Sequence, residues 1–109
     1  MPNPFYTARV AEFTEMLARY RVTISRGDLE ADCIRTPDRV VNVMETDNYV
    51  VRIETRVDML RAKFEELALG INQYFKATVS GEEREYRITA IEADDESEPT
   101  VQFTAARAI

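Results

Sequence analysis

The chain has no histidine and no tryptophan, and its 109 residues include only one cysteine and three glycines. Histidine is the commonest general base and a very common metal ligand, so its absence removes the usual starting point for catalysis or metal binding. A single cysteine excludes an intramolecular disulfide. The glycines are isolated, at Gly27, Gly70 and Gly81, so the chain has no glycine-rich phosphate-binding loop. The sequence therefore predicts a protein that is not an enzyme and uses no metal or cofactor.

Long hydrophobic runs are also missing. No apolar stretch approaches the roughly 18 residues of a membrane span, and the N-terminus lacks the basic and apolar regions of a signal peptide. We therefore expect no membrane partner and synthesis in the cytosol. The 20 acidic side chains outnumber the 14 basic ones, which gives a formal net charge of -6. That charge opposes attraction to phosphate backbones, so we expect no sequence-specific nucleic-acid binding.

The remaining reactive groups give weak signals. The acidic run from Asp94 to Glu98 lacks the alternating ligands and central glycine of a calcium-binding loop, so we expect a solvated turn there. Cys33 lies in an alternating stretch with Leu29 and Ala31. We expect a buried, inert thiol that behaves as a small hydrophobe, with a reactive or intermolecular cysteine as the alternative.

Length and composition favour one ordinary globular domain that spans residues 1–109. The chain is 45% hydrophobic and 31% charged, which is far from the composition of a disordered segment. Apolar side chains recur at intervals of three and four near the N-terminus and predict an amphipathic helix over about 4–20. They are Tyr6, Val10, Phe13, Leu17 and Tyr20. This helix packs either on the domain's own sheet or against a neighbouring subunit.

From about residue 21 to 109 the pattern is mostly that of β-strands, with apolar and polar residues alternating in short runs. A second, short helix interrupts them; we expect Asp58 to cap it and Gly70 to end it in a left-handed conformation. The fold class is therefore α+β, a small antiparallel β-barrel or sandwich of about six strands with an N-terminal helix and a second short helix between strands. The expected core residues are Val51, Ile53, Phe75, Ile88 and Phe103.

One segment, Asp38 to Asp47, shows no clear period and predicts a long loop or a frayed edge segment. Its apolar side chains form a partner surface unless they fold back on the core. Arg52 and Arg56 project from one strand face and either bind an acidic partner or form a solvated face that Glu54 partly neutralises. Together with two aromatic residues of the first helix, the candidate interface residues are Val40, Val41, Val43, Met44, Arg52, Arg56, Tyr6 and Phe13.

The order of elements is similar to that of the small head-tail joining proteins of long-tailed bacteriophages, the lambda-type neck protein family. The likeness covers most of the chain, and its last part joins a Gly81-Glu82 turn to an ending at Asp94 that looks like the family's final hairpin. The segments that carry it are Arg21 to Ile24, Leu29 to Arg35, Tyr49 to Thr55, Ala77 to Glu83 and Tyr86 to Asp94.

The resemblance implies a non-catalytic β-barrel subunit of the phage neck, the connector between head and tail. It implies a homo-oligomeric ring in the virion whose partners are portal or head-completion proteins and tail proteins, and it leaves room for a monomer before docking. The protein would occupy the host cytoplasm during assembly and then the virion. The second helix is longer than the family's corresponding segment, and the chain ends close to its last strand. Head completion and tail completion therefore both stay open, and a small bacterial binding or regulatory module of unknown ligand, inside or outside a prophage, is the alternative.

Overall fold

The computed structural model describes residues 4–45, 48–93 and 98–108. The backbone of Asp47 and the acidic run 94–97 lie outside these residues, as do the side chains of Val43 and Glu45. Two helices and seven strands follow one another along the described chain. They are α1 (Pro4–Tyr20), β1 (Val22–Arg26), β2 (Leu29–Arg35), β3 (Arg39–Glu45), β4 (Asn48–Leu60), α2 (Arg61–Glu66), β5 (Tyr74–Val79), β6 (Glu82–Ala93) and β7 (Thr100–Ala108).

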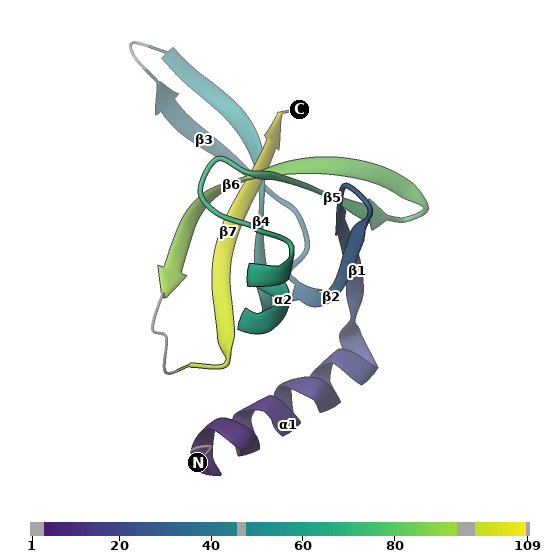
Figure 1. The fold of residues 1–109 in the computed structure, drawn as a ribbon. Helices are drawn as coiled ribbons and strands as arrows, with labels where there is room; N and C mark the ends of the chain where they lie inside the picture. The colour runs from purple at the N-terminus through teal and green to yellow at the C-terminus, as the bar shows by residue number, and fades with distance from the viewer. Residues whose placement is uncertain (1–3, 46–47, 94–97, 109) are drawn as a thin grey trace.

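Six of the strands close into an antiparallel barrel, and the seventh lies outside it (Figure 1). The sheet order is β2-β1-β5-β6-β7-β4-β3, and pairing of β2 with β4 closes the ring of strands. Closure removes the unpaired edges that an open sheet of short strands would expose. The predicted α+β fold with a barrel of about six strands is therefore confirmed.

A tight turn joins β5 to β6. Between β5 and β6 the last paired residues are Val79 and Glu82, so Ser80 and Gly81 alone form the loop. Both have positive φ, 52° and 80°, as a two-residue type I′ hairpin turn requires. The polar turn expected here from sequence is thus a rigid connection that fixes the register of β5 and β6.

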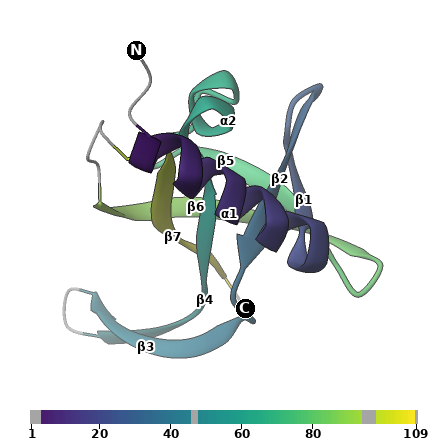
Figure 2. The ribbon, with the colours of Figure 1, turned by 90° about the horizontal axis from the view of Figure 1, so that it is seen from below.

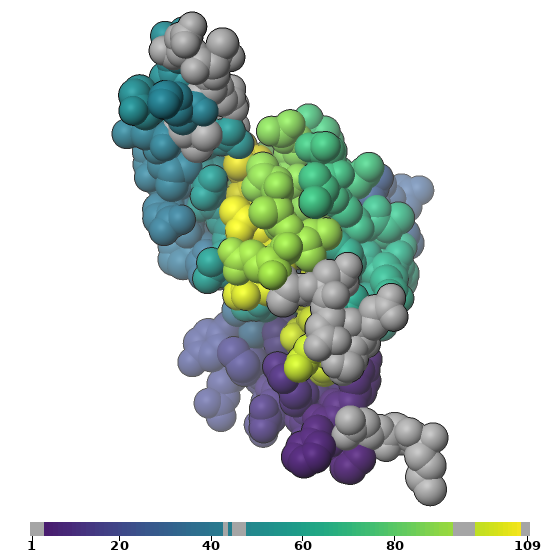
Figure 3. Space-filling model, turned by 90° about the vertical axis from the view of Figure 1, so that its left-hand side faces the viewer, coloured from purple at the N-terminus to yellow at the C-terminus, as the bar shows by residue number. Residues whose placement is uncertain are grey.

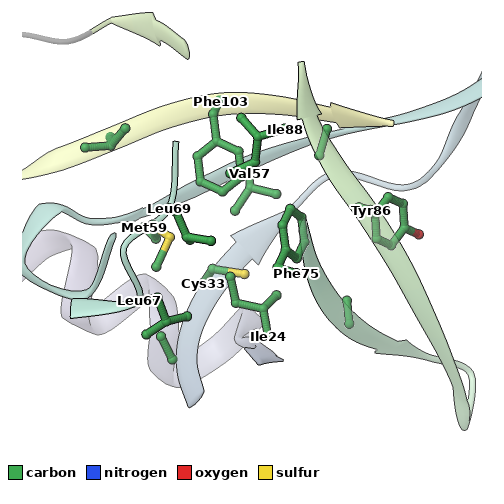
Figure 4. Packing of buried hydrophobic residues seen from close by; sticks show 14 residues of the cluster. Ile24, Cys33, Val57, Met59, Leu67, Leu69, Phe75, Tyr86, Ile88 and Phe103 are labelled. Atoms are coloured by element: carbon green, nitrogen blue, oxygen red, sulfur yellow. The ribbon is translucent and has the colours of Figure 1, made fainter. Parts of the chain in front are cut away.

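A single hydrophobic cluster fills the barrel (Figure 4). Phe75 stands at its centre: its ring stacks on Tyr86 at 5.6 Å and meets Phe103 edge-on at 5.9 Å. From α2, the ring of Phe64 lies 5.6 Å from Phe103, so the short helix closes one end of the core. Other fully buried members are Ile24, Cys33, Val57, Met59, Ile88, Val101 and Ala105.

The second helix is shorter than predicted, and its predicted cap is wrong. β4 continues to Leu60, and Asp58 lies inside that strand opposite Gln102 of β7. Leu60 occupies the N-cap position of α2 without a side-chain cap, and Ala68, rather than Gly70, adopts a positive φ. The spacing of apolar residues near 57–60 fits both the helical period and the strand period. Pairing of nine β4 residues with β7 favours the strand.

Three of the five predicted core residues, Phe75, Ile88 and Phe103, are fully buried. Ile53 is half-buried, and Val51 is 42% exposed, so its assignment to the core is wrong. All five lie on apolar strand faces as expected. The difference arises because β4 is longer than the barrel and its first residues run out beyond it.

Truncation of Phe103 to Ala is expected to lower the free energy of unfolding by about 3–5 kcal/mol, since it empties the centre of the core. Chemical denaturation monitored by circular dichroism measures this loss. The matched control is Val51→Ala on the same apolar face of the sheet, where exposure limits the loss to about 1 kcal/mol or less. Equal losses in the two variants would contradict the assignment of these faces.

Candidate functional site

β3 and the first half of β4 form a hairpin that projects from one end of the barrel, which we call the arm (residues 39–45 and 48–54). Seven residue pairs hold it, from Arg39 opposite Glu54 to Glu45 opposite Asn48. In Figure 3 the outer part of the arm projects beyond the barrel, while residues 52–54 at its base pair with β7. Of the two expectations for Asp38 to Asp47, the long loop is therefore wrong over the described residues, and the edge segment is the nearer one, because β3 is a regular strand at the edge of the sheet. Consecutive valines place apolar residues on both faces of β3, so the period-two signal is lost although the strand forms.

The apolar face of the arm continues the interior face of the barrel. In β4, the odd-numbered residues Thr55, Val57 and Met59 are buried inside the barrel. Side chains alternate along a strand, so Val51 and Tyr49 lie on the same face further out. There they have no barrel to cover them, and the exposed fraction rises to 73% at Tyr49.

β3 adds to this face, because residues directly opposite each other in an antiparallel pair point to the same side. Val40 lies opposite Ile53, and Met44 lies opposite Tyr49. Val40 is 66% exposed and Met44 62% exposed. We call Val40, Met44, Tyr49 and Val51 the docking face. Apart from the exposed Asn42, which lies opposite Val51 on the same side, this face is apolar and exposed, which is typical of a contact site for another protein.

A cluster of charged side chains joins the arm to the barrel at Asp38, directly before β3. The Asp38 carboxylate accepts hydrogen bonds from the Tyr86 hydroxyl at 2.9 Å, from Arg35 at 2.5 Å and from Arg84 at 3.1 Å. Arg107 lies 3.7 Å away and forms an ion pair. These partners come from β2, β6 and β7, so one carboxylate ties three barrel strands to the start of the arm.

The pKa of Asp38 reflects this setting. Burial raises it, but hydrogen bonds from Tyr86 and Arg35 and the positive charges of Arg35 and Arg107 lower it by more, so the pKa falls below its ordinary value. Asp38 is therefore ionised at neutral pH and balances a cluster of buried and half-buried arginines. The sequence gives one local signal for it, the Arg35–Asp38 spacing of three across a proline; the other partners are distant in the chain.

Backbone contacts fix the same junction. The Thr36 amide donates to the Arg56 carbonyl at 2.9 Å, and the Thr55 hydroxyl donates to the Thr36 carbonyl at 2.8 Å. Because both strands of the arm are held at their bases, the arm leaves the barrel in a defined direction.

A hollow of about 370 Å³ opens where the arm meets the barrel. Its walls combine apolar and basic side chains with a single carboxylate, Glu85. Such a lining suits a protruding side chain of a partner, either apolar or acidic. The lining residues are Val50, Val51, Arg52, Tyr74, Glu85, Arg87, Ala106 and Arg107.

The structure brings some of the predicted interface residues together and separates others. Val40 and Met44 lie on the docking face, Val41 is half-buried on the arm, and Arg52 lines the hollow. Val43 is opposite Val50 in the register, and its side chain lies outside the description. Arg56 is exposed on the barrel wall and bonds Glu92 at 2.7 Å, as expected for a neutralised strand face, although with Glu92 in place of Glu54.

The two helix residues are remote from the arm. α1 crosses the opposite end of the barrel (Figures 1 and 2). Phe13 is its one buried residue among those described, and Tyr6 is 37% exposed. An ion pair between Arg9 and Glu98, at 2.6 Å, also ties the helix to the barrel. Exposed Phe5, Met16 and Tyr20 leave part of the helix surface apolar.

Reactive chemistry is sparse in the described part of the chain. Cys33 is fully buried in the core, and this burial raises the pKa of its thiol to about 12. The described residues contain no group of three or more cysteine, aspartate or glutamate side chains placed to hold a metal ion. Among the same residues, no helix is long and apolar enough to cross a membrane.

Comparisons with protein-family models and with curated proteins find no match to this chain.

Replacement of Asp38 by Asn is expected to lower the free energy of unfolding by about 2–3 kcal/mol at neutral pH, since it removes the carboxylate shared by Arg35 and the half-buried Arg84 and Arg107. A folded pKa below the ordinary value near 3.8 means that this stabilisation is complete above that value and is lost as pH falls through the folded pKa. Denaturation at a series of pH values should therefore show the two proteins converging in acid. The control is Glu92→Gln, which breaks an exposed pair and costs about 1 kcal/mol or less.

Cys33 is expected to resist thiol reagents in the folded protein, because so little thiolate forms in the sealed core. Reaction with a chromogenic disulfide reagent should proceed only as fast as the chain unfolds and should become rapid in denaturant. Fast labelling of the native protein would contradict the burial of this residue.

Proposed function

We propose that this protein is a non-catalytic structural subunit of a phage virion that joins head to tail in the neck, and that its arm makes the contact with the adjoining head or tail protein. The observation that carries the proposal is the docking face: an apolar strand face that starts inside the barrel and continues, uncovered, into the arm. Exposure of so many large apolar side chains lowers solubility, so a partner that covers them explains their presence.

The arrangement suits a connector subunit in two further ways. The closed barrel forms a stable body without the arm, since the described core cluster lies within the barrel. The Asp38 cluster holds the arm at its base, which limits the conformational freedom lost on docking. In the proposed assembly the barrels form a ring through contacts between neighbouring subunits, and the arms reach toward the next layer of the neck. Assembly takes place in the host cytoplasm, and the product is the virion.

The alternative is a small bacterial binding module, inside or outside a prophage, and the hollow at the base of the arm favours it. Its volume of about 370 Å³ is within the range of small-ligand sites, but it is open and has several charged walls. Of the docking face only Val51 lines this hollow, so a small-ligand site leaves the exposure of Val40, Met44 and Tyr49 unexplained, which is why we place it second.

The test replaces the exposed docking-face residues Val40, Met44 and Tyr49 together with Ser. We expect thermal stability to stay within a few degrees of the parent, since these side chains lie outside the core, and joining of heads to tails in an assembly reaction to fall at least tenfold. Joining is counted as infectious particles formed from purified heads, tails and protein.

The matched control replaces Leu29 and Ile71, which are similarly exposed on the barrel, with Ser and should join normally. Normal joining by the arm variant would remove the docking face from the mechanism and leave the binding module as the better explanation. A large loss of stability would mean instead that these residues support the fold.

A further inference from the structure

The outer edge of β3 is open. β3 is the last strand in the sheet order, and within the described residues only β4 pairs with it. A seven-residue edge with unpaired backbone groups is a template for another strand, and proteins usually protect such edges.

The backbone orientation of β3 follows from its partner. The Arg56 carbonyl accepts from Thr36, so the even-numbered residues of β4 direct their backbone polar groups to the β3 side. The register pairs these even-numbered residues with odd-numbered residues of β3, for example Arg52 with Val41. The backbone N–H and C=O groups of Val40, Asn42 and Met44 therefore point to the open edge.

The sequence of β3 is complementary to itself when read in opposite directions. It is Arg-Val-Val-Asn-Val-Met-Glu from Arg39 to Glu45. In an antiparallel pairing of two copies centred on Asn42, Arg39 of each copy lies opposite Glu45 of the other, and Val40 opposite Met44. In this register the hydrogen-bonded pairs would be Val40 with Met44 and Asn42 with Asn42. These are the residues whose backbone N–H and C=O groups point to the open edge.

We propose that the free protein forms a two-fold dimer in which the β3 strands of two arms pair edge to edge, with the Arg39–Glu45 charge pair at each end. The occupant of the open edge is thus a second copy of this chain. Opposite charges at the two ends favour this partner and register over a strand that lacks them, and Asn42 lies opposite itself between apolar residues.

The biological role that we give this dimer rests on the proposed function. Before the neck forms, the arm must stay soluble although it carries an open edge, and pairing with a second copy covers that edge. The ring uses head-to-tail contacts between barrels, whereas this contact is two-fold and occupies the arms. The dimer therefore has to open before the arm can reach the next layer of the neck. The arm edge therefore regulates when the subunit becomes available.

Charge reversal tests the pairing directly. Arg39→Glu and Glu45→Arg each place like charges opposite each other at both ends, and each should raise the dimer dissociation constant about tenfold or more in analytical ultracentrifugation. Arg39 also pairs with Glu54 within the arm at 3.8 Å, so amide hydrogen exchange must show that the arm stays intact in each variant. The double variant restores opposite charges and should dimerise like the parent. Arg19→Glu, an exposed reversal on α1, carries the same change in net charge as Arg39→Glu and should leave the dimer intact.

Mixing the two single variants gives the sharpest result. In a heterodimer of Arg39→Glu with Glu45→Arg, both end pairs are attractive, so two weakly associating proteins should form a dimer on mixing. A parent that stays monomeric at all concentrations, a dimer that is indifferent to the reversals, or a mixture that does not associate would each overturn the proposal. Association of the parent with another protein but not with itself would also overturn it.

Proline substitutions test the backbone part of the inference. Asn42→Pro removes an N–H that points to the open edge, which edge strands tolerate, so the hairpin should persist while the dimer is lost. Val41→Pro removes an N–H bonded to β4 and should disrupt the arm itself. Amide hydrogen exchange reports arm integrity in both variants, and a dimer that survives Asn42→Pro with an intact arm contradicts edge pairing.

Failure here and failure of the proposed function are separable. The dimer is measured on the purified protein alone, and head-tail joining is measured with the docking-face variant. A monomeric parent whose docking-face variant fails to join leaves the function standing without the dimer; the converse leaves the dimer without the function.

Discussion

The length of β4 is the constraint on which the rest of the structure depends. Its 13 residues exceed what the barrel can cover, and it pairs with β7, β2 and β3 along different parts of its length. The inner part supplies Val57 and Met59 to the core and closes the barrel through β2. The outer part supplies one strand of the arm. Since one strand serves both, the body and the arm are parts of one continuous sheet.

The Asp38 cluster fixes the direction in which the arm leaves the barrel. A long hairpin on a barrel could leave it at many angles, because a twisted sheet bends easily. Here one carboxylate receives hydrogen bonds from β2 and β6 and an ion pair from β7 at the point where β3 begins. Loss of water from these charged groups is costly, and their mutual pairing offsets that cost only in this geometry. The ion cluster therefore contributes direction, while the apolar core contributes most of the stability.

Much of the fold could be predicted from the sequence, because alternation and turn chemistry are local. α1 has the expected bounds, and the turn at Ser80-Gly81 overlaps the expected Gly81-Glu82 turn. β3 was missed because Val40 and Val41 are both apolar and no alternation marks their faces. The misplaced start of α2 and the exposure of Val51 share another cause: both depend on how far β4 extends relative to its neighbours, which is a property of the whole sheet. The candidate site was anticipated through the exposed apolar residues of segment 38–47, but the role of Asp38 was not, since Arg84, Tyr86 and Arg107 are more than 40 positions away in the chain.

The continuity of β4 also determines how the molecule responds to force. A pull on the arm along β4 reaches the barrel through its nine residue pairs with β7, from Arg52–Ala108 to Leu60–Thr100. Such a load acts along the strands and is shared by all the hydrogen bonds between them at once, rather than opening them one after another from an end. Antiparallel strands loaded in this way resist as a unit. Tension applied to the arm is therefore carried directly into the most extensively paired part of the barrel.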